Sequence, residues 1–596
     1  MIILGINAYH ADSSAAIFVD GKMIAAIEEE RFRRVKHWAG FPQLSIAFCL
    51  QEADIGYADV DYYAIGRDPK AKFLKKLLYL AKNPGGSFNA IKDRFINSKK
   101  VASIDEELSR LSGLSASTFT GKIKQVEHHR SHIASSFFAS PFDKAACLTI
   151  DGSGDFTTTM TAIGEGNTIT VLDSVDFPHS IGIFYTAFTQ LLGFPHYGDE
   201  YKVMGMAPYG SREAAVVSRE LAVVGGEDTA KGQRLADKLA KVVKLTDDGL
   251  FKLDLSYFRT GTQGIISYGE DNAPVVAPLY SEKMISEFGA PRKNDEPLTQ
   301  YHKDLAASVQ AFTEKIIFHL LENLHKKTGL DNVCIAGGVA QNSVANGKIL
   351  RNTSFKNIYI PSAGHDAGIS MGAALYTQHV SLNYKRQPAI KSAYTGSRFS
   401  NAEIKEMLTA KNIAFTELAD EPLFNRITDC MINGGVVGWF SGRAEFGPRA
   451  LGGRSIIADP RRNDAKEILN TKIKRRESFR PFAPSILKEY VGEYFEITDE
   501  VPFMEKVYPI KKEKQALIPA VTHVDGTGRL QSVDKDISPR YYQLIDAFRQ
   551  KTGIPVLLNT SFNENEPIVN RPEEALACYL RTNMDMLVME NILVSR

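Results

Sequence analysis

Short apolar runs at the start of the chain predict a β-hairpin followed by a third strand. Residues 2–6 and 15–19 are apolar and flank the polar stretch Asn7–Ser14, and Asp20-Gly21 then leads into residues 22–30 (KMIAAIEEE). Apolar runs bounded by Asn, Asp, Ser and Gly are typical of strands joined by turns. We therefore expect three strands at the N-terminus.

The same pattern returns about 140 residues later. Ala145–Ile150 and Thr157–Ala162 are apolar or β-branched runs separated by the turn Asp151–Asp155, and a second turn at residues 164–167 leads into Thr168–Leu172. Two such units indicate a duplicated domain. The layout resembles the actin/Hsp70/sugar-kinase (ASKHA) ATPase core, in which two hairpins face a nucleotide cleft.

The rest of the chain predicts one insertion and a second domain. A helical, charged stretch (Ser211–Val243) opens a weakly patterned region, about 211–300, which we interpret as an insertion. Further expected elements are a helix at Leu305–Leu324, strands at Val333–Ala336, Gly435–Phe440 and Ile554–Asn559, and a polar connector at Gln378–Ser400. Since single cores stop growing near ~250–300 residues, we expect two α/β domains, 1–380 and 395–596.

Composition narrows the class of protein. Of 596 residues 44% are hydrophobic, and 71 Lys+Arg against 70 Asp+Glu give a net charge of +1. This balance indicates neither a nucleic-acid partner nor an anionic membrane. Five scattered cysteines without a CxxC pair suit a reducing compartment, and neither a leader nor a long apolar run is visible, so we expect a cytoplasmic protein.

A histidine-rich motif, residues 127–132 (EHHRSH), opens an Ala/Ser/Phe-rich helix. His128 and His132 are four residues apart, so their imidazoles share a helix face and suit two adjacent positions on a metal ion. Asp151 and Asp366, each between small residues at the end of an element, are candidates to complete the site. A helix cap with hydrogen-bonded histidines is the simpler alternative for this motif alone.

Two glycine-spaced turns lead from strands into helices. Residues 336–346 (AGGVAQNSVAN) and 364–372 (GHDAGISMG) let the backbone approach a ligand, and a helix N-terminus offers free N–H groups to phosphate. For residues 336–346, a tight strand-to-helix turn without a ligand is an equally good interpretation.

Three further groups of charged residues are candidates for a site. Residues 198–208 (GDEYKVMGMAP) hold two carboxylates and a lysine, for which a Glu200–Lys202 ion pair is the structural interpretation. Residues 28–37 (EEERFRRVKH) are most simply a solvated helix with internal ion pairs. His10 and Asp12, at the first hairpin turn, instead suit a cleft.

The most unusual stretch is basic. Residues 443–480 contain eleven Arg or Lys and five Asp or Glu, interleaved with Gly, Pro and Phe rather than placed on a polar helix face. Guanidinium groups bind phosphate oxygens in bidentate fashion, so we favour a polyphosphate or acyl-phosphate site over an ion-pair network. Polar turns at 523–529 (HVDGTGR) and 559–563 (NTSFN) are candidates to complete it.

Together these motifs resemble the O-carbamoyltransferase family that includes nodulation, cephem and aminoglycoside carbamoyltransferases, over essentially the whole chain. The resemblance implies a first domain like the metal-binding threonylcarbamoyl-transfer ATPase-fold proteins and a second domain of YrdC-like fold. It implies that ATP and carbamoyl phosphate form O-carbamoyladenylate, whose carbamoyl group passes to a hydroxyl of a small-molecule acceptor, such as an antibiotic or toxin precursor.

The resemblance also implies roles for particular residues. A divalent ion, Fe²⁺ before Mn²⁺ or Zn²⁺, would bind His128, His132, Asp151 and Asp366, and Mg²⁺ would accompany ATP. Acceptor chemistry would involve His10, Asp12, Lys36, His128 and Lys202, and nucleotide binding in the first domain Gly152, Gly154, Gly337, Gly338 and Asn342. Carbamoyl phosphate and ATP would contact Arg443, Arg449, Arg454, Lys474, Arg476, Arg480, Arg529, Asn559 and Ser561 in the second domain.

Three other functions compete with this interpretation. A sugar-kinase-type phosphotransferase shares the hairpin pattern but leaves the arginine-rich region without a role. A tRNA-modifying threonylcarbamoyl enzyme predicts a broad basic surface, which the net charge disfavours. A non-catalytic nucleotide-binding regulator is the third. The acceptor, the metal and the oligomeric state, including a homodimer, stay open.

Overall fold

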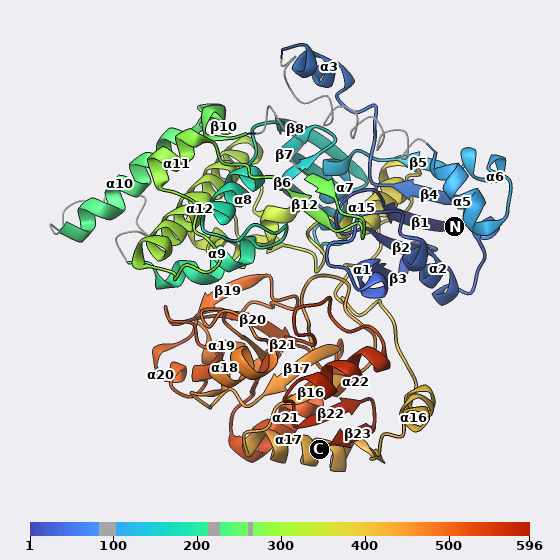
Figure 1. Ribbon diagram of the computed structural model, residues 1–596. Helices are drawn as coiled ribbons and strands as arrows, with labels where there is room; N and C mark the ends of the chain where they lie inside the picture. The colour runs from blue at the N-terminus through green and yellow to red at the C-terminus, as the bar shows by residue number, and fades with distance from the viewer. Residues whose placement is uncertain (83–102, 212–226, 260–265) are drawn as a thin grey trace. The chain divides into compact units, whose positions relative to one another are not determined.

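The computed structural model describes residues 1–82, 103–211, 227–259 and 266–596 (Figure 1). The chain forms two compact units. The first comprises Met1–Glu30, Val35–Ala345 and Ile349–Ala389, and the second comprises Arg31–Arg34, Asn346–Lys348 and Ile390–Arg596.

The N-terminal sheet of the first unit has five strands in the order β3-β2-β1-β4-β5. Its strands are β1 (Ile2–Asn7), β2 (Ser14–Val19), β3 (Lys22–Glu28), β4 (Tyr62–Ile65) and β5 (Ile123–Gln125). β1 pairs antiparallel with β2 and parallel with β4, and β2 pairs antiparallel with β3. The three predicted N-terminal strands are therefore present and lie in one sheet.

The second sheet of this unit repeats that arrangement in the order β14-β13-β6-β7-β8. Its strands are β6 (Lys144–Gly154), β7 (Thr157–Glu165), β8 (Thr168–Asp176), β13 (Asn332–Ala336) and β14 (Asn357–Tyr359). As in the first sheet, the first strand, β6, pairs antiparallel with the next strand, β7. β6 also pairs parallel with β13, which follows after a long connection. The matching topologies confirm the predicted actin-like duplication.

Two buried helices lie between these sheets. α7 (His128–Phe137) packs against β6, β7 and β13, α15 (Gly368–Tyr376) packs against β1, β2 and β4, and the helices pack on each other (Figure 1). Gly5 and Gly372 permit this packing, because a Cβ at either position would overlap the carbonyl of Ser370 or Ser131. The ends of these elements carry most of the candidate site.

The first unit contains further helices and small strands. They are α2 (Gln43–Glu52), α3 (Phe73–Lys82), α5 (Ile104–Ser112), α6 (Ser117–Thr120), α8 (Ile181–Leu191), α9 (Glu200–Met206), α10 (Glu227–Val242), α11 (Glu282–Phe288), α12 (Gln300–Thr328) and α14 (Ile349–Asn352), with β9 (Val243–Leu245), β10 (Phe251–Leu253), β11 (Ile266–Tyr268) and β12 (Pro274–Val276). Two short helices, α1 (Glu30–Arg33) and α13 (Ser343–Asn346), begin in the first unit and end in the second. Of the helical stretch predicted at 211–243, residues 212–226 lie outside the described part, and α10 accounts for the rest.

One local prediction is wrong. Residues 28–37 are not a solvated helix, because Glu28, Glu29 and Arg31 are buried and α1 has four residues. The Glu29 carboxylate accepts hydrogen bonds from the Leu44 and Ser45 N–H groups, which begin α2. The charged pattern therefore belongs to buried polar contacts rather than to a surface.

The second unit is built on a nine-stranded mixed sheet, ordered β15-β23-β22-β16-β17-β21-β18-β20-β19. The strands are β15 (Thr416–Glu417), β16 (Val437–Phe440), β17 (Arg454–Ala458), β18 (Ala483–Leu487), β19 (Lys506–Pro509), β20 (Thr527–Val533), β21 (Val556–Ser561), β22 (Met586–Met589) and β23 (Ile592–Ser595). The helices are α16 (Asn401–Ala410), α17 (Asp420–Ile432), α18 (Ala465–Ile468), α19 (Val491–Tyr494), α20 (Lys512–Gln515), α21 (Pro539–Thr552) and α22 (Pro572–Arg581). A large buried cluster that includes Trp439 and Phe548 joins sheet and helices, which confirms the predicted α/β class.

No helix within the described ranges is long and apolar enough to span a bilayer.

Candidate functional site

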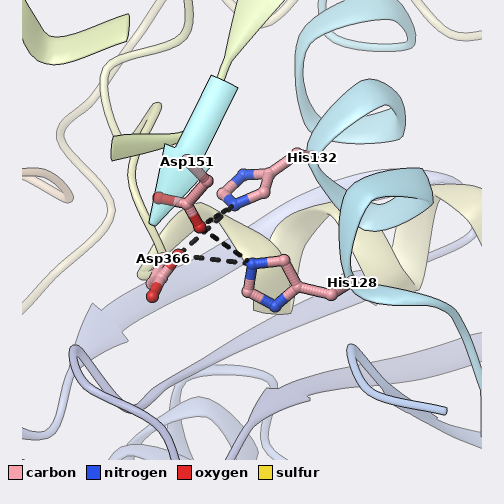
Figure 2. Close-up of side chains that lie close together, drawn as sticks. All are labelled: His128, His132, Asp151 and Asp366. Atoms are coloured by element: carbon pink, nitrogen blue, oxygen red, sulfur yellow. Dashed lines mark hydrogen bonds and ion pairs between the residues drawn. The ribbon is translucent and has the colours of Figure 1, made fainter. Parts of the chain in front are cut away.

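Four buried side chains of the first unit converge on one point. His128 and His132 project from α7 toward Asp151, at the end of β6, and Asp366, in the turn before α15 (Figure 2). His128 Nε2 lies 3.1 Å from Asp151 Oδ2, and His132 Nε2 lies 3.3 Å from Asp366 Oδ1. One ligand atom from each residue lies within 4.8 Å of the others.

The chemistry of this set fits a divalent ion. Two imidazoles and two carboxylates are a donor set used for Zn²⁺, Fe²⁺ and Mn²⁺. His132 Nε2 and Asp366 Oδ1 are buried without a hydrogen-bond partner, which is costly unless a ligand satisfies them. The residues therefore suit a metal centre.

Charge–charge contacts dominate the cluster. Burial opposes ionisation of Asp151, yet the hydrogen bond with His128 and the neighbouring His132 hold the pKa of Asp151 well below its usual range. Burial likewise opposes protonation of His132, but the neighbouring carboxylates of Asp151 and Asp366 raise the pKa of His132 to about 9. Burial and Asp151 oppose ionisation of Asp366, but His10 and His132 outweigh them and lower the pKa of Asp366, so both carboxylates stay ionised, as metal ligands require.

Local backbone features position these ligands. Glu127 caps α7 by accepting the Arg130 N–H, and Asp155 accepts the N–H of His128. The Gly338 N–H donates to Asp151 Oδ1 at 2.9 Å. Gly154 has no room for a Cβ, which would overlap the ring of His128, whereas Gly152 faces open space.

The third histidine of the motif, His129, is structural. Its Nδ1 lies 2.7 Å from Thr149 Oγ1, and its Nε2 lies 3.0 Å from the Thr157 carbonyl oxygen. Burial and the neighbouring histidines hold its pKa well below the usual value. His129 therefore joins α7 to the second sheet as a neutral side chain.

The candidate acceptor residues divide into two groups around the cluster. His10 Nδ1 lies 2.6 Å from Asp366 Oδ2, and the ring of His10 lies 5.3 Å from that of His128. Asp12 does not contact the four ligands; its Oδ1 is 2.7 Å from His37 Nδ1. Asp12, Glu30 and His37 also lie close enough to hold a cation, although the Asp12–His37 hydrogen bond already joins the facing atoms.

The structure corrects the pairing expected near Lys202. Lys202 forms an ion pair with Asp199 at 2.8 Å rather than with Glu200. Glu200 instead accepts a hydrogen bond from the Thr186 hydroxyl, and burial raises its pKa. Lys36 is exposed.

The residues predicted to bind a nucleotide in the first unit differ in their surroundings. Gly337 has φ +99° and approaches the Ile150 carbonyl too closely for any side chain, and Gly338 lies beside Asp151. Asn342 is buried, and its amide forms a reciprocal pair with Gln310. That pairing favours a structural role for Asn342.

In the second unit the charges of three arginines act on a fourth, Arg529. Burial, followed by the charges of Arg449, Arg476 and Arg480, holds the pKa of the Arg529 guanidinium well below its usual value. Arg529 Nε is buried without a hydrogen-bond partner. Guanidinium groups gathered at a partly buried position repel one another, and a bound anion relieves that repulsion, so the cluster suits phosphate groups.

Other residues of the basic stretch are engaged in structure. Arg454 is fully buried, donates to the carbonyls of Gly442, Gly453 and Ser397, and stacks on Phe440. Arg443 donates to the Thr395 carbonyl. These contacts favour a scaffolding role for Arg454, although the sequence suggested phosphate binding.

The polar turn at 559–563 holds a buried lysine. Lys474 Nζ donates to the Ser561 and Asn563 carbonyls and to Asn563 Oδ1. Asn559 Nδ2 donates to the Ala450 carbonyl and Ser485 Oγ, while Asn559 Oδ1 is buried without a partner. The turn therefore connects β21 to the basic loops.

Sequence reasoning missed two residues of these sites. His37 pairs with Asp12 although 25 residues separate them. Glu445 lies inside the basic loop, where its Oε1 accepts the N–H groups of Leu451 and Gly453. In the sequence, His37 belongs to a charged run that we assigned to the surface. Glu445 is one carboxylate among many arginines, and no sequence pattern distinguishes it.

The chain combines a duplicated actin-like unit that holds a His/Asp cluster with an α/β unit that holds clustered arginines. The chain belongs to the carbamoyltransferase family: the profile "Carbamoyltransferase N-terminus" matches residues 2–375 and "Carbamoyltransferase C-terminus" matches residues 428–596. The protein is a carbamoyltransferase.

Relatives extend over the whole chain. It is 36% identical to nodulation protein NolNO of Sinorhizobium fredii, covering 99% of this chain and 80% of that protein. It is 26% identical to nodulation protein U of Bradyrhizobium diazoefficiens, covering 94% and 92%. Among solved structures, HypF of T. kodakarensis aligns with a TM-score of 0.29 at 14% identity over 64% of this chain and 47% of that one.

Proposed function

We propose that the protein uses ATP and carbamoyl phosphate to form O-carbamoyladenylate and transfers the carbamoyl group to a hydroxyl of a small molecule. The observation that carries this proposal is the pair of dissimilar sites: a buried His/Asp cluster in one unit and an arginine cluster in the other. Carbamoyl phosphate is a weak electrophile toward alcohols, and an adenylate offers a better leaving group.

The second unit activates the donor in this scheme. Arg449, Arg476, Arg480 and Arg529 bind the phosphate groups of ATP and carbamoyl phosphate, which relieves the mutual repulsion of the arginines. Ser561 and Asn559 lie on the β21 end joined to this loop system. Mg²⁺ enters with ATP as part of the substrate.

The first unit performs the transfer. His128, His132, Asp151 and Asp366 hold a divalent ion, Fe²⁺ before Mn²⁺ or Zn²⁺, which when bound polarises the carbamoyl carbonyl as a Lewis acid. Asp366 also holds His10 beside the cluster. Gly152 leaves space for the nucleotide, because no atom lies within 4 Å of a Cβ at that position, and Gly154, Gly337 and Gly338 offer the nucleotide backbone rather than side chains.

The first test is exchange of labelled pyrophosphate into ATP. The wild-type protein should catalyse the exchange only when carbamoyl phosphate is present, since the adenylate forms from both substrates. Exchange that ignores carbamoyl phosphate, or none in metal-loaded protein, would contradict the proposal. Mass detection of carbamoyl adducts in a panel of hydroxylated metabolites would then identify the acceptor class.

A further inference from the structure

A histidine–aspartate pair lies beside the metal-ligand cluster of the first unit and has the geometry of a catalytic dyad. Asp12 is buried, its Oδ1 lies 2.7 Å from His37 Nδ1, and the His37 side chain is 30% exposed. A buried carboxylate on one ring nitrogen fixes the tautomer, so that Nδ1 carries a proton and Nε2 presents a lone pair.

The rest of the ring is also positioned. The His37 N–H donates to Glu30 Oε2 at 2.8 Å, and the ring packs edge-on against Tyr197, with centroids 5.1 Å apart. A Cβ at Gly198 would overlap His37 Nε2, so this glycine keeps the second nitrogen clear of side-chain atoms. Within the described residues no hydrogen bond uses Nε2.

The dyad is joined directly to the metal-ligand cluster. The Asn7 side-chain amide donates to the carbonyl oxygens of both Asp12, at 3.1 Å, and Asp366, at 3.0 Å. Asn7 is buried at the end of β1, so the two turns that carry Asp12 and Asp366 are held together. Asn7 therefore fixes the turn of the dyad's carboxylate next to the turn of a metal ligand.

We propose that His37 is the general base of the transfer step: its Nε2 accepts the proton of the attacking hydroxyl while Asp12 orients the ring. The inference rests on the proposed function. The acceptor oxygen forms a bond to the carbamoyl carbon, the bond from that carbon to the adenylate oxygen breaks, AMP leaves with the electron pair, and the hydroxyl proton moves to His37.

The surrounding charges set the pH dependence. Burial lowers the pKa of His37, but the charge and hydrogen bond of Asp12, followed by Glu30, outweigh it and raise that pKa to about 9, against a small opposing effect of Lys36. Tyr197 and Glu200 are the other titratable groups nearby, and burial raises the pKa of each. Transfer should therefore accelerate with pH up to about 9, as the base loses its proton.

The experiment uses full-length, metal-loaded protein with ATP, carbamoyl phosphate and water as the probe acceptor, and measures AMP release. His37→Gln should release AMP at least ~100-fold more slowly than wild type and lose the alkaline rise, while pyrophosphate exchange persists. His196→Ala, which removes an exposed histidine two residues before Gly198, is the matched control and should match wild type in both assays.

Hydroxylamine as the acceptor distinguishes a general base from a structural residue, because hydroxylamine attacks the carbamoyl carbon without general-base assistance. His37→Gln should release AMP at nearly the wild-type rate with hydroxylamine. AMP release within twofold of wild type in water, or equal losses with water and hydroxylamine, would overturn the proposal. Absence of exchange in the wild type would instead refute the proposed function on which it rests.

Discussion

At the scale of single residues, the glycines near the His/Asp cluster are as informative about the site as its charged residues. Gly154 lies beside the ring of His128, and Gly152, two residues earlier on the same strand, faces open space. Both are glycines of one motif, yet only one is required by packing. They form a matched pair for testing whether the position of His128 matters.

Gly154→Ala should lose bound metal, because its Cβ forces the His128 ring away from Asp151 and Asp366. Gly152→Ala should retain it, since no atom lies within 4 Å of the added carbon. Metal per chain, measured by mass spectrometry after dialysis, should fall at least tenfold in the first variant and stay unchanged in the second. Equal metal content would show that the cluster does not bind the ion.

The Asp12–His37 pair should also appear in folding stability. The folded-state pKa of His37 is raised to about 9, so protonated His37 stabilises the fold fully below its unfolded pKa of ~6.5. That contribution is lost as pH rises from ~6.5 through about 9. The free energy of unfolding of wild type minus that of His37→Gln, from urea titrations, should therefore decrease across this window; a flat difference would mean that the pair is not ionic.

The histidine pairing illustrates what sequence shows at this scale. The His128/His132 spacing indicated a shared helix face because helical geometry is periodic, and the structure brings both imidazoles to Asp151 and Asp366. The Asp12–His37 contact joins residues 25 apart through tertiary packing, and no local pattern encodes it.

At the scale of elements, the basic loop of the second unit is organised around an acid. Glu445 is buried, and its Oε1 accepts N–H groups from Leu451 and Gly453, with Arg454 N at 3.3 Å. Gly452 adopts φ +106°, which lets the chain turn around the carboxylate. The glycines that suggested a ligand-binding loop thus also serve this internal contact.

Glu445→Gln should destabilise the second unit, since a neutral amide oxygen replaces a carboxylate that accepts several N–H groups. The cost should be about 1.5–3 kcal/mol, the range for hydrogen bonds to a charged group. Glu467→Gln, at an exposed position of the same region, should change the unfolding free energy by less than ~0.5 kcal/mol. Equal midpoints in thermal denaturation would contradict this role.

The elements themselves followed from the sequence where periodicity was strong. The hairpins of both sheets and the long helix α12 were predictable because apolar periodicity reports the buried face. The charged run at 28–37 misled because burial of Glu29 depends on the N-terminus of α2, which packs there only in the folded unit. Arg454 and Lys474 donate to main-chain carbonyls, and Lys474 also donates to Asn563 Oδ1; composition does not reveal such contacts.

At the scale of the whole molecule, the two units carry different chemistry. The first holds imidazoles and carboxylates, and the second holds guanidinium groups whose charges oppose one another. The carbamoyltransferase family profiles match residues 2–375 and 428–596, so both units belong to the family. In the proposed mechanism each site serves one step, so each step should fail separately when its own site is altered.

The most direct test compares His128→Ala with Arg449→Ala in the two half-reactions. We expect His128→Ala to keep carbamoyl-phosphate-dependent pyrophosphate exchange within severalfold of wild type while carbamoyl transfer, followed as AMP release, falls below detection. Arg449→Ala should lose the exchange itself, and with it every later step. If both variants lost the same half-reaction to the same extent, activation and transfer would share one site and the division of labour would be wrong.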